Sequence, residues 1–108
     1  MVKRSETLNL IFSSLADPTR RDMLERVAKR EYSVGELVQE YDISFAAVSK
    51  HLKVLEGARL ISKRKEGKRH IVTISPSALQ TADAYLEKYR QLWQGRYNKL
   101  EALLKKGA

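Results

Sequence analysis

The feature that most constrains the fold is a segment, residues 33 to 74, in which a short helix pattern, a tight turn, a second helix pattern and a basic hairpin follow one another. Its sequence is SVGELVQEYDISFAAVSKHLKVLEGARLISKRKEGKRHIVTI. This order predicts a helix-turn-helix followed by a wing, an arrangement that fits a DNA groove. Charge gathers in the same place, because residues 44 to 70 carry +6 of the chain's +8, while residues 34 to 43 carry −3.

The composition narrows the kinds of partner and site that the chain can have. A sequence pI of about 9.9 favours an anionic partner, either a nucleic acid or an acidic membrane surface. The chain has no cysteine, which excludes disulfides and thiolate metal sites and fits a cytoplasmic location. Polar residues interrupt the apolar positions near the N-terminus, and no apolar run approaches the roughly 20 residues of a membrane span, so neither a signal peptide nor a membrane helix is expected.

The chain is 108 residues long, which predicts one domain. The order of its patterns makes this domain, residues 1–108, a winged helix-turn-helix. The expected fold class is mainly α with a small β-hairpin (α+β). Its expected order is four helices, two strands and a final helix. The strands lie over 60–65 and 69–74, where β-branched residues flank Glu66-Gly67-Lys68.

Capping residues mark where the helices begin and end. After a first helix over 5–14, Asp17-Pro18 begins the second, because Asp is a good N-cap and Pro suits the first helical position. Residues 33–36 have the capping-box spacing that begins the third helix. Ser44 is predicted to cap the start of the fourth helix, over 44–56, and Gly57 to end it in the left-handed conformation that glycine tolerates.

Apolar residues at helical spacing predict the core. The second helix, the third helix, the turn after it and the fourth helix all contribute. The residues expected to face inward are Met23, Leu24, Val27, Ala28, Leu37, Val38, Tyr41, Ile43, Val48, Leu52 and Leu55.

The fourth helix presents small and basic residues on the face opposite its apolar stripe. Ala46 and Ser49 would let a helix approach base edges closely, and Lys50 and Lys53 can pair with phosphates. A solvated basic face on an ordinary helix is the alternative, but the turn before it and the basic wing after it favour DNA. The residues predicted to contact double-stranded DNA are Ser44, Phe45, Ala46, Ala47, Ser49, Lys50, His51, Lys53, Lys63, Arg64, Lys65, Lys68 and Arg69.

The wing carries five basic residues within residues 63–69. Like charges so close together repel, which phosphate contact or insertion of the tip into the minor groove would explain. Protection of an edge hairpin against aggregation is the alternative, although it rarely needs so many charges. Arg20 and Arg21, at the start of the second helix, could also contact phosphate.

No metal site, cofactor or enzyme activity is expected. His51 and His70 are the only histidines, and no carboxylate lies three or four residues after His51. His51 is therefore expected to pack at the edge of the fourth helix or to contact a phosphate. Neither a nucleophile–base arrangement nor a glycine-rich phosphate loop is present.

A long last helix is expected over 76–106. At roughly 1.5 Å per residue, this helix would be about 45 Å long. Its apolar residues form a near-heptad stripe that Arg96 interrupts, and such a stripe needs a partner helix. The aromatic residues on this helix are Tyr85, Tyr89, Trp93 and Tyr97. A dimer core explains them best, and an apolar effector pocket between paired helices is the alternative.

Three segments and the aromatic last helix resemble ArsR-type winged-helix transcriptional regulators. The segments are LADPTRRDML (15–24), VGELVQEYDIS (34–44) and AVSKHLKVLEGARLISKRKEGKRHIVTI (47–74). The resemblance implies a homodimer, joined through the helices at 5–14 and 76–106, that binds a palindromic operator and mostly represses transcription. The side chains expected in the dimer interface are Leu8, Ile11, Phe12, Leu86, Tyr89, Trp93, Tyr97 and Leu100.

The chain departs from the metal-sensing members of that family. Residues 36–40 lack the cysteine motif found there, and the last helix has no histidine, so metal, arsenite and thiol sensing are not expected and the effector stays open. Phe45 stands where many relatives have a polar residue, and could only stack or meet a thymine methyl. A non-specific architectural DNA-binding protein and a winged-helix protein-interaction module remain as alternatives.

Overall fold

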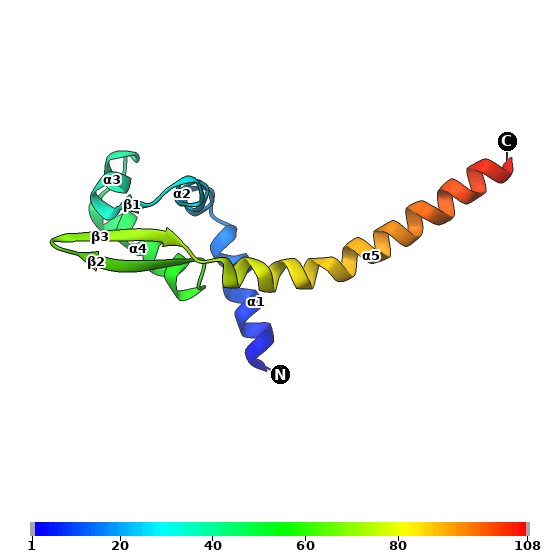
Figure 1. Cartoon of the computed structure of the whole chain (residues 1–108), viewed down its shortest axis with the longest axis horizontal. Coiled ribbons are helices and arrows are strands. Elements are labelled where there is room, and N and C mark those ends of the chain that lie inside the picture. The colour runs from blue at the N-terminus through cyan, green and yellow to red at the C-terminus, as the bar shows by residue number, and fades with distance from the viewer. Residues whose placement is uncertain (1, 108) are drawn as a thin grey trace.

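The computed structural model describes residues 2–107, with side chains described for residues 6–105. Four helices and a small sheet form a body, from which one long helix projects (Figure 1). The molecule measures 67 × 34 × 22 Å as a result. The elements are α1 (Val2–Leu15), α2 (Pro18–Lys29), β1 (Tyr32–Ser33), α3 (Val34–Gln39), α4 (Phe45–Gly57), β2 (Ile61–Glu66), β3 (Arg69–Ile74) and α5 (Pro76–Gly107).

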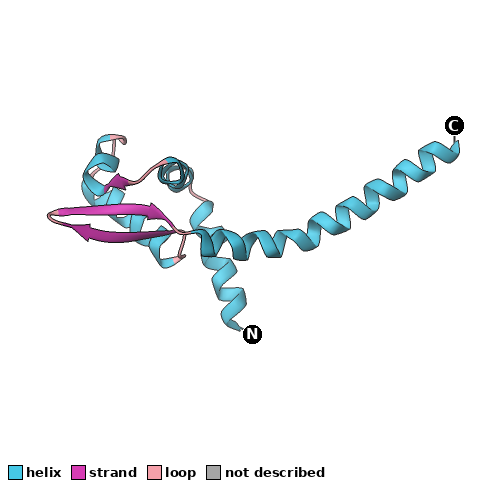
Figure 2. Cartoon of the chain, viewed as in Figure 1, coloured by secondary structure: helices cyan, strands magenta, loops and turns pink. Residues whose placement is uncertain are grey.

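The predicted fold class is confirmed: the chain is mainly helical with a small antiparallel sheet, in the winged helix-turn-helix order (Figure 2). The side chains predicted to cap helices do so. Asp17 accepts from the Arg20 N–H at 3.0 Å, and Ser44 caps α4 in the same way. At α3, Ser33 and Glu36 each accept from the other's backbone N–H, which completes the capping box.

The sheet has three strands in the order β1–β3–β2, all antiparallel. The hairpin is confirmed, and its tight turn has Gly67 at φ 64°, a conformation that suits glycine. Strand β1 was not predicted, because two residues are too short to show a period of two. It pairs Tyr32 with Val72 and Ser33 with Ile71.

The prediction that Gly57 takes the left-handed conformation at the end of α4 is wrong. The helix continues through Gly57, and Arg59 has φ 60° instead. The Arg59 N–H donates to the Glu56 carbonyl and the Leu60 N–H donates to the Leu55 carbonyl, both at 3.0 Å. This is a Schellman arrangement, which turns the chain so that Leu60 is fully buried.

The core lies between the inner faces of α1 to α4, the sheet and the first turns of α5. Most predicted core residues are buried or packed against the core, and two are corrected. Ala28 is exposed because it lies about 100° around α2 from the buried Val27, past the edge of the packed face. Ile43 is 40% exposed because the turn between α3 and α4 carries it to the surface.

Within residues 2–107, no helix is both long enough and apolar enough to cross a membrane. The first turns of α5 are held by the body, because Ala78 and Ala82 are buried in the core. The rest of α5 extends away from the body, and every residue from 88 to 105 is exposed (Figure 1).

The end of α4 gives a test of where the backbone takes its left-handed turn. A Cβ on Gly57 would meet no atom within 4 Å, so Gly57→Ala should raise the free energy of unfolding by about 0.5–1 kcal/mol. Arg59→Gly should raise it by about 1 kcal/mol, because the left-handed strain at that residue disappears. Thermal unfolding of both variants measures this, and destabilisation by Gly57→Ala would place the left-handed residue at Gly57 after all.

Candidate nucleic-acid interface

Helix α4 has one buried face and one face open to solvent. Val48, Leu52 and Leu55 are fully buried in the core. The opposite face therefore points outward, and Phe45, at its N-terminal end, is 61% exposed. The predicted DNA-contacting residues that this helix exposes fully or partly are Phe45, Ala46, Ala47, Ser49, Lys50, His51 and Lys53.

A groove runs between the outer face of α4 and the wing, which is the β2–β3 hairpin. Its C-terminal part is lined by Ala46, Lys50 and Lys53 of α4 together with Lys63 of the wing. Its other part lies nearer the N-terminus of α3. The residues lining that part are Ser33, Val34, Gly35, Phe45, Ser49, Lys63, Lys68, Arg69 and His70. The fold thus brings most of the predicted residues of α4 and the wing into one open, basic groove.

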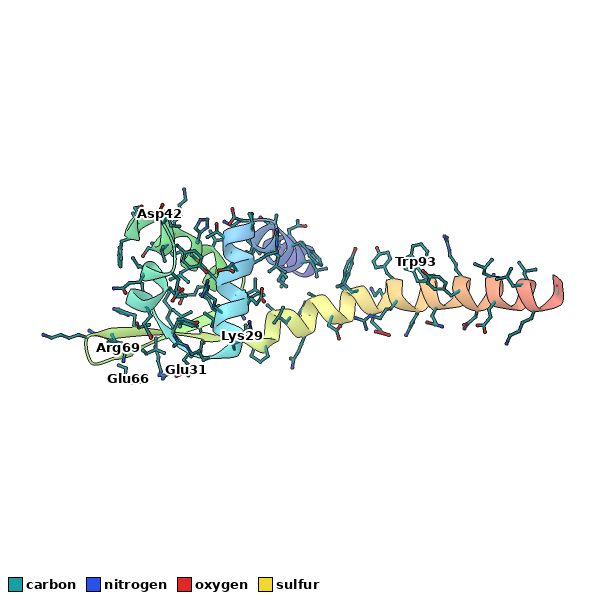
Figure 3. The ribbon with its side chains drawn as sticks, turned by 90° about the horizontal axis from the view of Figure 1, so that it is seen from above. Lys29, Glu31, Asp42, Glu66, Arg69 and Trp93 are labelled. Carbon is teal, nitrogen blue, oxygen red and sulfur yellow. The ribbon has the colours of Figure 1, made fainter. Side chains whose placement is uncertain are left out.

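The two faces of strand β2 differ in function, because successive side chains of a strand point to opposite faces. Lys63 faces α4, where its Nζ lies 3.6 Å from Glu56 Oε1. Arg64 faces away from the groove and donates to both carboxylate oxygens of Glu31, each at 2.8 Å. It also donates to Glu66 at 3.1 Å. Glu31 and Glu66 lie along one side of the hairpin in Figure 3.

These ion pairs change the acidity of the carboxylates involved. Hydrogen bonds from Arg64 lower the pKa of the Glu31 carboxyl below its ordinary value. The Ser33 N–H is the largest cause of the lowered pKa of Glu36, and the charges of Arg30 and Arg69 add to it. Both carboxylates therefore stay ionised, and the arginines that they hold are partly neutralised within the protein.

Comparison with known proteins places this geometry in a family. A family model described as "Bacterial regulatory protein, arsR family" matches residues 17–63. The HTH-type transcriptional regulator Rv2034 of Mycobacterium tuberculosis is 40% identical over 78 residues, which are 72% of this chain and 73% of that protein. The chain belongs to the ArsR family.

Other relatives agree with this assignment. The transcriptional repressor SdpR of Bacillus subtilis is 29% identical over 73 residues, covering 68% of this chain and 81% of that protein. A crystal structure of an ArsR family transcriptional regulator, RHA00566, has a TM-score of 0.78 and 33% identity, covering 83% of this chain and 93% of that one. The chain is therefore a DNA-binding transcriptional regulator and not an enzyme.

The lysines and arginines of this ArsR-family regulator are used differently. Among the described residues, Lys50, Lys53, Lys65 and Lys68 form no ion pair. Arg69 lines the groove but lies 3.4 Å from Glu36, and Arg64 is not part of the groove lining. These unpaired lysines are thus available to phosphates.

His51 and Arg20 form a contact that the sequence did not reveal. The Arg20 Nη1 lies 3.2 Å from His51 Nδ1, and the His51 side chain is 23% exposed. His51 therefore packs at the edge of α4, the first of the two positions expected for it. The other two guanidinium nitrogens of Arg20 donate to carbonyls at the end of α1, so groups of the protein itself hold this half-buried arginine.

The regulator exposes a second surface along α5. Phe12 of α1 lies beside Tyr85, with ring centroids 6.0 Å apart, and begins an apolar stripe. Trp93 lies on the projecting part of α5 (Figure 3). The exposed large side chains of the stripe and its margins are Phe12, Leu86, Tyr89, Leu92, Trp93, Tyr97, Leu100, Leu103 and Leu104.

One residue predicted for the dimer interface is corrected. Ile11 has no exposed surface, because α1 turns it into the core rather than toward the stripe, so a partner cannot reach it. Leu8 is half-buried and lines a hollow between α1 and α5.

Within the part of the chain that the structure describes, no three histidine or carboxylate side chains come together as a metal site.

Lys65 and Arg64 are neighbours in the wing but lie on opposite faces of β2, so substituting them should change the salt dependence of DNA binding differently. Lys65→Ala should reduce the magnitude of the salt slope of binding to random duplex DNA by about 1, because an unpaired cation would leave a phosphate. Arg64→Ala should change that slope much less, since Glu31 and Glu66 already hold its guanidinium. Binding measured from 50 to 200 mM salt decides this, and equal changes for the two variants would contradict the assignment.

Proposed function

We propose that this regulator is a cytoplasmic homodimeric repressor that binds a palindromic operator through α4 and the wing. The observation that carries the proposal is the open groove in which unpaired lysines of both elements surround the outer face of α4. Small residues at Ala46 and Ser49 let the helix approach base edges, and Lys50 can donate to a base or a phosphate. Repression is supported by the likeness to a protein named as a transcriptional repressor.

The stripe on α5 supports the homodimer. Trp93 is 55% exposed and Tyr97 is 62% exposed, although both are large and mainly apolar. Contiguous exposed apolar surface of this kind marks an interaction site in a soluble protein. The α5 helix of a second copy carries the same stripe. Packing the two stripes together would remove their apolar surface from water, which stabilises a dimer by about 25 cal/mol for each Å² buried.

The charges along α5 support an antiparallel pairing of the two helices. Arg90 forms ion pairs with Asp83 and Glu87 of its own helix, whereas residues 91–105 carry +2, from three basic residues against Glu101. Antiparallel pairing keeps the positively charged C-terminal parts of the two helices apart, and parallel pairing places them side by side. A two-fold dimer of this form presents two copies of α4 to one duplex.

Selection from random duplexes, followed by sequencing, tests the operator. We expect an imperfect palindrome whose half-site centres lie about 10 bp apart, or a multiple of that distance. Phe45 predicts a thymine in each half-site, where the methyl group meets the exposed ring. An asymmetric single site would contradict the dimer geometry, and the absence of any motif would favour an architectural DNA-binding protein.

Trp93→Glu tests the dimer surface. A charge inside an apolar interface costs several kcal/mol, so the variant should be a monomer at micromolar concentration in sedimentation, where the original chain is a dimer. Gln94→Glu is the matched control, because it adds the same charge one position away, outside the apolar stripe. A chain that is monomeric without any substitution, or equal loss of the dimer in both variants, would overturn this assignment.

A further inference from the structure

The guanidinium of Arg20 connects three helices. It lies on α2, and its Nε donates to the Ser14 carbonyl at 2.8 Å while Nη2 donates to the Ser13 carbonyl at 3.2 Å. These carbonyls belong to the last turn of α1, where carbonyls lack a partner within the helix, although the Ala16 N–H also donates to the Ser13 carbonyl at 3.2 Å. The remaining nitrogen, Nη1, lies 3.2 Å from Nδ1 of His51 on α4.

The contact with Arg20 defines the state of the His51 ring. A guanidinium has only donors, so His51 Nδ1 must accept and the ring proton lies on Nε2. Asp17 Oδ2 is 3.9 Å from the same Nδ1 and also caps α2 through the Arg20 N–H. The charges on Arg20 and Asp17 thus face the ring from α2 and from its N-cap.

The helices joined in this way have different tasks in the proposed function. Helix α1 contacts α5 through Phe12 and Tyr85, at the start of the apolar stripe. Helix α4 carries Lys50 and Lys53 on either side of His51 in the sequence. A displacement of the last turn of α1 would therefore move the Arg20 guanidinium, and with it the point at which α4 is held.

We infer that Arg20 and His51 are positioning residues, which fix α4 relative to α1 so that the arrangement of the α1–α5 surface determines how α4 meets DNA. The inference rests on the proposed function in one respect, namely that α4 contacts the operator. It assigns no phosphate contact to His51. Direct phosphate binding by His51 is the competing explanation, and the tests below separate the two.

The first experiment compares His51→Leu, which removes the acceptor, with His51→Asn, which places an oxygen acceptor near the position of Nδ1. Val54→Ala is the control for weakened packing of the same helix, since Val54 is half-buried on α4. The full chain is titrated against a 30-bp duplex with the selected operator and against a random duplex of the same length. We expect His51→Leu to weaken operator binding about tenfold with little effect on the random duplex, and His51→Asn to stay within about threefold.

A second substitution separates positioning from phosphate contact. In an Arg20→Met background, His51→Leu should have no further effect, because the contact that it removes is already absent. Independent phosphate contacts from the two residues would instead give losses that add. Additive losses, or failure of His51→Asn to restore operator binding, would overturn the inference.

Hydrogen exchange of the free protein tests the same connection without DNA. His51→Leu should speed exchange at the backbone amides of α4 and of the last turn of α1 together, whereas Val54→Ala should affect α4 alone. Unchanged exchange in α1 would reject the inference. If no duplex is preferred over random DNA, the proposed operator binding fails, but the exchange measurement still decides whether Arg20 and His51 hold the helices together.

Discussion

The burial of one face of α4 is the constraint on which the rest of the structure depends. Val48, Leu52 and Leu55 are fully enclosed, and each such side chain contributes about 1.5–3 kcal/mol when it leaves water. Because a helix is stiff, fixing this face also fixes the opposite one, which carries Lys50 and Lys53. The wing, α2 and α1 pack around α4 through their own contacts, and the outward face of α4 is by then already determined.

Features that depend on neighbours in the sequence could be predicted. The Ser33–Glu36 capping box and the Asp17 cap involve residues three apart, and the turn at Gly67 separates two β-branched strands. The near-heptad stripe of α5 likewise follows from spacing alone. The prediction for Gly57 was wrong because it was based on residue type alone. The left-handed residue is Arg59, two positions later, because the chain must turn there for Leu60 to be buried.

Contacts between distant side chains could not be predicted. The sequence places Lys63 and Arg64 side by side in one basic run, yet the alternation of strand β2 sends the first toward α4 and the second to Glu31, 33 residues earlier. The contact of Arg20 with His51 spans 31 residues and has no periodic signal. Periodicity placed Ile11 on an apolar face, but it could not decide whether the protein's own core or a partner covers that face.

The chemistry of the two basic residue types explains how the wing is both held and left charged. The planar fork of arginine matches a carboxylate in two parallel hydrogen bonds, which suits Arg64 to fix the hairpin against Glu31 at the protein's surface. Lysine is a compact, strongly hydrated charge on a flexible stem, so Lys65 and Lys68 keep their freedom and their full charge. The ion pairs on one face thus give the wing its position, while Lys68 of the wing, with Lys50 and Lys53 of α4, gives the groove its attraction for phosphate. Alternation along β2 places Lys65 on the face opposite Arg64 and its carboxylates, so position and residue type together separate holding the wing from binding DNA.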